Sequence, residues 1–183
     1  MENVFDTLCS ALGEPENKKL FLDSEGVDLM VLMLKYACLS LVHLHVLTSF
    51  REKKQSRSRS IKALDYAMSG PAGSACCEVF VEALGLKSLF STFMSKVSKK
   101  NKTQNEDVSH TLGIVASLFT NLASESPARI RLLAKFVENT YEKTDKLLEI
   151  RDAAQGRLKE VEKEIETEKK VRCARQCKPK HAS

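Results

Sequence analysis

Tryptophan is absent from the 183 residues, and glycine and proline are scarce, with seven and four copies. Aromatic residues make up only 6% of the chain, while stretches rich in leucine, lysine and glutamate recur along it. Straight-chain side chains of this kind lose little rotamer freedom in a helix, which favours helix over sheet. A content of 43% hydrophobic and 29% charged residues is typical of a folded protein. We therefore predict an all-α fold.

Motifs for catalysis are missing as well. The sequence contains no nucleotide-binding loop, no nucleophile elbow and no His-Glu metal motif. We expect no enzymatic activity, no cofactor and no small-molecule substrate. Cys173, Cys177 and His181 lie four residues apart, but three ligands at this unusual spacing are a weak zinc signal, and we expect no metal site.

Signals for secretion are also lacking. The six cysteines have no regular spacing, and the N-terminus has neither the basic nor the apolar region of a signal peptide. A reducing compartment, the cytosol or the nucleus, is expected.

The net charge of +5 is unevenly distributed. Residues 1–50 carry three lysines and seven acidic groups, a net −4, and the remaining residues carry a net +9. The densest basic stretch is 51–102, with eleven Lys or Arg against four Asp or Glu. Such a patch can steer acidic partners or RNA, can act as a nuclear address, or can simply be a solvated lysine-rich surface.

An internal repeat organises residues 1–138. Residues 21–30 align with 80–89 at an offset of 59, and residues 136–137 align with 80–81 at an offset of 56. Both offsets exceed the roughly 40 to 47 residues of armadillo-type units. The apolar block 36–50 and the lysine-rich stretch 96–107, which we interpret as a loop, are surplus, and removing each leaves a period of 44. We predict about three armadillo-like units.

Each unit is expected to contain three short helices that bury their apolar faces by stacking on neighbouring units. We expect Gly26 and Gly85 to stop a helix in the left-handed conformation, and Ser60 to cap another. The expected helices cover residues 16–22, 60–69, 74–84 and 108–123. The expected core faces are Leu29, Met30, Met33 and Leu34 in the first unit, and Leu86, Leu89, Phe90 and Phe93 in the second.

After the repeats, residues 139–171 read as one long charged helix. Ala154, Leu158, Val161 and Ile165 follow 4, 3, 4 spacing over about two heptads, fewer than a coiled coil normally needs. We interpret the helix as packing on the array or as a partner-binding strip, and residues 172–183 as a disordered tail.

The sequence resembles the family of beta-catenin-like protein 1 from residue 1 to about 171. The segments that carry the resemblance are 29–34, 51–58, 62–71, 80–86 and 135–139, with 118–123 typical of armadillo repeats generally. The resemblance implies a nuclear armadillo-type protein associated with the spliceosome through the nineteen complex and its Myb-related core subunit. It also implies recognition of basic, nuclear-localisation-type segments of partners.

Two segments depart from the family pattern. Residues 36–50 look like an insertion, such as a translated intron, and the tail 172–183 differs from the pattern, with later repeats missing. A truncated or aberrant isoform with impaired function is therefore one interpretation.

Asp6, Asp65 and Asn121 occupy the same slot in successive units, on the helix that lines the groove in armadillo folds. Carboxylates there would pair with Lys or Arg of an extended peptide, and the amide would bond its backbone. The alternative is that all three are solvated residues near helix ends. Separately, Ser56, Ser58 and Ser60 alternate with arginine and are candidate phosphorylation sites, although five residues are few for an Arg-Ser domain.

We predict a nuclear scaffold that binds proteins in pre-mRNA splicing. A membrane-associated helical protein using residues 29–50 is one alternative, although Lys35, His43 and His45 interrupt that segment. A direct RNA-binding protein is the other, although aromatic residues that stack on bases are not interleaved with the basic ones. We expect neither direct nucleic-acid binding nor membrane binding.

Overall fold

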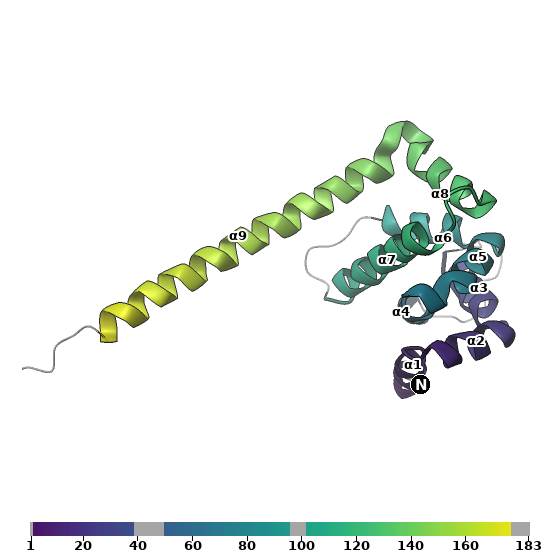
Figure 1. Ribbon diagram of the computed structural model, residues 1–183, viewed down its shortest axis with the longest axis horizontal. Helices are drawn as coiled ribbons and strands as arrows, with labels where there is room; N and C mark the ends of the chain where they lie inside the picture. The colour runs from purple at the N-terminus through teal and green to yellow at the C-terminus, as the bar shows by residue number, and fades with distance from the viewer. Residues whose placement is uncertain (1, 39–49, 96–101, 177–183) are drawn as a thin grey trace, which may run out of the picture. The chain divides into compact units, whose positions relative to one another are not determined.

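The computed structural model describes residues 2–38, 50–95 and 102–176 (Figure 1). Over these ranges the chain is helical, without any strand, as predicted for an all-α protein. The elements in order are α1 (Glu2–Ala11), α2 (Pro15–Asp23), α3 (Gly26–Cys38), α4 (Phe50–Met68), η1 (Pro71–Gly73), α5 (Ser74–Glu82), α6 (Gly85–Phe93), α7 (Lys102–Asn121), α8 (Pro127–Val137), η2 (Glu138–Tyr141) and α9 (Glu142–Gln176).

The chain divides into two compact units, Met1–Glu138 and Asn139–Ser183. In the first unit, the three-helix repeat α2–α3–α4 is followed by α5–α6–α7, with α1 before them and α8 after. Helix α3 packs against α4 of its own repeat and against α5 and α6 of the next. Helix α4 contacts both α1 and α7, so the helices that close successive repeats are neighbours (Figure 1).

The first two helices of each repeat are joined through one left-handed residue. Glu25 and Leu84 have φ angles of 55° and 60°, and the glycine that follows each begins the next helix. A Cβ on Gly85 would lie 2.4 Å from the buried ring of Phe80, and a Cβ on Gly26 would meet the equivalent phenylalanine at the same distance. The prediction that the glycines themselves are left-handed is therefore wrong. They are needed because a ring packs against their Cα atoms.

The buried helix faces also repeat. Helix α6 buries the predicted face of Leu86, Leu89, Phe90 and Phe93. Helix α3 buries the residues 59 positions earlier, Val27, Met30, Val31 and Leu34. Leu29, which was expected in the core, is exposed because it lies one residue off this stripe.

The third helix of each repeat begins earlier than the sequence pattern suggested. Helix α4 begins at Phe50, so Ser60 lies inside it and its hydroxyl donates to the carbonyl of Ser56 at 2.8 Å instead of capping the helix. Helix α7 begins at Lys102, so residues 102–107 of the expected loop are helical. Of the expected insertion 36–50, residues 36–38 belong to α3 and Phe50 to α4, and residues 39–49 lie outside the described ranges.

Cationic side chains bridge elements of the first unit by capping helix C-termini. Lys35 of α3 donates to the carbonyl of Ala83, just after α5, at 2.7 Å. Lys18 of α2 donates to the backbone carbonyl of Ser69 and, at 3.0 Å, to its hydroxyl, beyond the end of α4. The last carbonyls of a helix have no partner within it, so each lysine supplies a donor that the helix itself does not.

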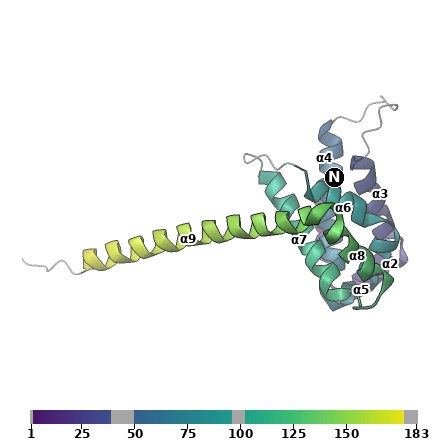
Figure 2. The ribbon, with the colours of Figure 1, turned by 90° about the horizontal axis from the view of Figure 1, so that it is seen from above.

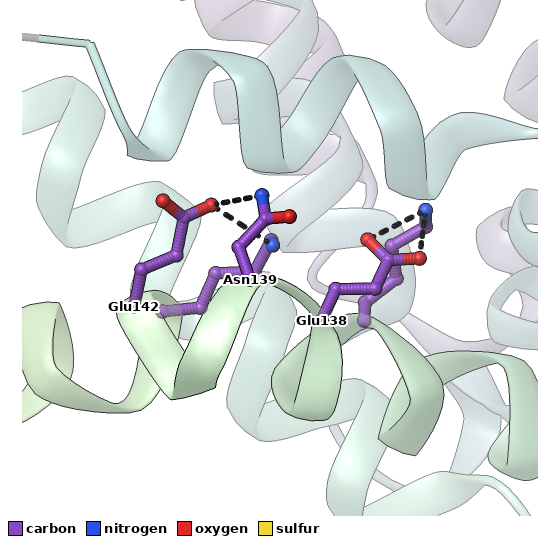
Figure 3. A network of polar contacts seen from close by, with 5 residues as sticks. Glu138, Asn139 and Glu142 are labelled. Carbon is purple, nitrogen blue, oxygen red and sulfur yellow. Dashed lines mark hydrogen bonds and ion pairs between the residues drawn. The ribbon is translucent and has the colours of Figure 1, made fainter.

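The second unit is dominated by α9, a single helix through Gln176 (Figure 2). Residues 172–176 of the expected disordered tail therefore belong to it. Before the helix, Asn139 donates to Glu142 at 2.7 Å, whereas Glu138 of the first unit accepts from Lys135 at 2.8 Å (Figure 3). The bond from Asn139 to the Glu142 carboxylate lowers the pKa of Glu142.

Candidate partner-binding groove

The repeat-closing helices α1, α4 and α7 form a groove with a volume of about 670 Å³. Helix α4 supplies the largest part of its lining, through residues spaced as one helical face. The groove is lined by Phe5, Asp6, Lys54, Gln55, Ser58, Arg59, Lys62, Tyr66, Glu106, Asp107 and His110. This groove lies on the helices that close successive repeats, and whether a partner binds there stays a prediction.

Asp6 is the predicted groove residue that does line this space. Its side chain is 56% exposed and forms an ion pair with Lys62 of α4, with 2.7 Å between Oδ1 and Nζ. The hydrogen bond to Asp6 raises the pKa of Lys62. A cationic group of a partner can therefore approach Asp6 only by sharing or displacing Lys62.

Asp65 occupies the equivalent slot in α4 but lies among side chains of the protein. Its carboxylate contacts Nδ1 of His110 at 2.8 Å, and a Cβ on Gly113 would lie 2.2 Å from its Oδ1. Burial raises the pKa of Asp65, and the hydrogen bond to His110 opposes this shift. The carboxylate therefore joins α4 to α7.

Asn121, at the equivalent position of α7, forms hydrogen bonds with the backbone of its own chain. Its amide nitrogen donates to the carbonyl of Met68 at 2.9 Å and to that of Gly70 at 2.8 Å. Gly70 has a φ of 67°, so the amide supports the turn that follows α4. Of the three equivalent residues, the structure brings Asp6 to the groove and gives Asp65 and Asn121 internal partners.

The alignment of the repeats did not predict the aromatic and cationic residues of the groove. The guanidinium of Arg59 lies 5.6 Å from the ring centroid of Phe5, a cation–π contact. The rings of Tyr66 and His110 lie 6.3 Å apart. Positions 55, 58, 59, 62 and 66 of α4 follow helical spacing and lie on one face. Had the helix been predicted to begin at Phe50 instead of Ser60, this spacing would have indicated them as one face.

Charges of both signs line the groove. Asp6, Glu106 and Asp107 are acidic, and Lys54, Arg59 and Lys62 are basic. Asp107 is only 7% exposed, and burial raises its pKa. The exposed carboxylates available to a partner are therefore Asp6 and Glu106.

The candidate phosphorylation sites lie within α4. Ser60 is fully buried and Ser56 is half-buried. The hydroxyl oxygen of Ser58 is also buried. A kinase would need α4 to open locally before it could reach Ser58 or Ser60.

Other kinds of site gain no support within the described residues. Among them, no group of three His, Cys, Asp or Glu side chains could hold a metal ion. None of the helices in the same ranges is both long and apolar enough to cross a membrane. Cys76 and Cys77 are buried thiols in the core, and burial raises the pKa of Cys77 to about 11.

Repeated three-helix units with a groove on their closing helices define an armadillo-type helical-repeat protein. The chain belongs to the family described as catenin-beta-like, Arm-motif containing nuclear, whose sequence model matches residues 1–182. Beta-catenin-like protein 1 of Homo sapiens is 42% identical over 172 residues, covering 92% of this chain and 27% of that protein. The homolog of Schizosaccharomyces pombe is 40% identical over 162 residues, covering 88% of this chain and 25% of that protein. The chain thus spans about a quarter of the length of these relatives.

Proposed function

We propose that this chain is a non-catalytic scaffold of the nucleus that binds partner proteins in pre-mRNA splicing. The observation that carries the proposal is the groove across three successive repeat-closing helices, which offers exposed charges and aromatic rings to an extended segment. The family description supports the nuclear location. The resemblance described above supports the association with splicing proteins of the nineteen complex.

The lining of the groove narrows the kind of segment that it fits. Asp6 and Glu106 are suited to lysine or arginine side chains of the partner, as expected for a basic segment. Lys54 and Arg59 on the same groove would repel a purely basic segment and attract interspersed acidic residues. We therefore propose a basic partner segment that also carries carboxylates.

Peptide binding to the full chain tests this proposal. The probes are two fluorescently labelled peptides of equal length, one of mixed lysine and glutamate and one of lysine with neutral residues, followed by anisotropy. We expect tighter binding of the mixed peptide. Asp6→Lys and Glu106→Lys should each weaken it about fivefold, since one exposed charge pair contributes up to about 1 kcal/mol.

Glu78→Lys is the matched control, because Glu78 is exposed on α5 outside the groove and the charge change is the same. Equal weakening by all three variants would show only a general charge effect and would contradict the groove. A single-stranded oligouridine probe distinguishes the other function. Tight binding of this RNA with a steep salt dependence would favour an RNA-binding protein instead.

The association with splicing needs a separate measurement. Tagged chain expressed in cells should appear in the salt-extracted nuclear fraction and should co-precipitate subunits of the nineteen complex. Asp6→Lys should reduce the co-precipitation if the groove makes the contact. A requirement for detergent, or recovery of the complex at the level of an untagged control, would refute this part of the proposal.

A further inference from the structure

Helix α9 carries an apolar stripe that the structure leaves exposed. Leu158, Val161 and Ile165 are 57%, 49% and 45% exposed, and Ala154 lies on the same stripe one step earlier. Their spacing is that of alternating core positions in a coiled coil. A stripe of this kind stabilises a helix when it packs against another stripe.

We propose that α9 pairs with α9 of a second copy of this chain in an antiparallel coiled coil. The two-fold axis passes between Lys159 and Glu160, so residues whose numbers sum to 319 face each other. Leu158 then packs against Val161 of the second copy, and Ala154 against Ile165 of the second copy. Each layer then combines a larger with a smaller side chain, whereas a parallel pair would leave one layer with only the two methyl groups of Ala154.

The charged residues that continue the stripe decide the direction. Three residues before Ala154 the seam reaches Arg151, and three residues after Ile165 it reaches Glu168. A parallel pair would put Arg151 against Arg151 and Glu168 against Glu168, which is repulsive at both ends. The antiparallel pair puts Arg151 against Glu168 of the second copy at each end.

Arg151 is available for this contact. Its guanidinium bonds the neighbouring Asp152 at 2.8 Å, with both side chains about two-thirds exposed. An exposed pair of this kind is weak, and the arginine has donors left for a second carboxylate.

The charge of α9 as a whole favours the same direction. Residues 160–168 hold five glutamates and one lysine, a net −4. Residues 151–159 hold Arg151, Arg157 and Lys159 against Asp152, a net +2. Antiparallel pairing places these oppositely charged segments together, whereas parallel pairing places the acidic segments of the two copies side by side.

The flanking positions agree as well. In the antiparallel pair Arg157 lies beside Glu164 of the second copy, and symmetry repeats this contact. The paired segment 151–168 is about 27 Å long at 1.5 Å per residue, which is short for a coiled coil. We therefore expect a reversible dimer with a micromolar dissociation constant.

Sedimentation equilibrium of the full chain over a range of concentrations tests the proposal. The wild type should associate to a dimer, and Leu158→Glu should weaken the association at least about tenfold, because charge replaces a central core side chain. Lys163→Glu is the control, since Lys163 lies on the opposite face of α9. Far-UV circular dichroism checks that each variant keeps the helical content of the wild type.

A charge swap tests the direction. Arg151→Glu and Glu168→Arg should each weaken the dimer, because each puts like charges in one layer, and the double variant should restore it. In a parallel dimer, neither single swap changes the sign of any pair. A monomer at all concentrations, a dimer insensitive to Leu158→Glu, or single swaps without effect would each overturn the antiparallel pairing.

Discussion

Gly85 lies directly against the ring of Phe80, five residues earlier, with no room for a β-carbon between them. The same relationship links the first glycine of α3 to the phenylalanine of α2, so each repeat uses it to bring its first two helices together. The pair is therefore a structural signature of the repeat as well as a sequence motif.

Replacing Gly85 by alanine should destabilise the first unit. The new Cβ would lie 2.4 Å from the ring of Phe80, which is fully buried, and overpacking of this kind costs about 1 to 3 kcal/mol. Urea unfolding of the full chain measures the loss. Phe80→Leu in the same chain should relieve part of the clash, so the double variant should lose less than the two single variants together. Additive losses would argue against a direct clash.

The buried faces show how far the sequence could predict this fold. The repeat offset, applied to the correctly predicted face of α6, gives Val27, Met30, Val31 and Leu34 as the core face of α3. Reading α3 by itself selected Leu29, because α3 is apolar on nearly every side and its own pattern does not distinguish one face. Comparison between repeats contained the information that local periodicity lacked.

The candidate site was less predictable for a different reason. The equivalent positions Asp6, Asp65 and Asn121 were recognised, but their roles depend on partners distant in sequence. His110 lies 45 residues from Asp65, and Met68 lies 53 residues from Asn121. The repeat determines where a residue is placed, but its chemistry depends on the side-chain or backbone groups that the adjacent repeat places against it, and these differ from one unit to the next.

Lys35 should contribute to the contact between the repeats. Its amine donates to the Ala83 carbonyl, so Lys35→Met keeps the apolar stem and leaves the carbonyl without this donor. We expect a loss of about 1 to 2 kcal/mol in the free energy of unfolding. Lys19→Met, at an exposed position of α2, is the matched control and should change the stability little. Equal effects of the two substitutions would show that the bond to Ala83 contributes nothing specific.

The half-buried carboxyl of Asp65 should make stability depend on pH. Burial raises its pKa in the folded chain above the ordinary value of 3.8, so as pH rises past 3.8 the unfolded chain loses this proton first. The stability that Asp65 contributes is therefore greatest below pH 3.8 and falls as pH rises through the folded pKa.

Asp65→Asn removes this titration while keeping the shape of the side chain. As pH rises from below 3.8 through the folded pKa, the unfolding free energy of the wild type should fall relative to that of Asp65→Asn. Above the folded pKa the difference between the two should stay constant. Thermal unfolding across this range measures the difference, and carbon NMR of the carboxyl locates the midpoint directly. A midpoint at or below 3.8, or a difference that shifts in favour of the wild type as pH rises, would show that the bond to His110 outweighs burial.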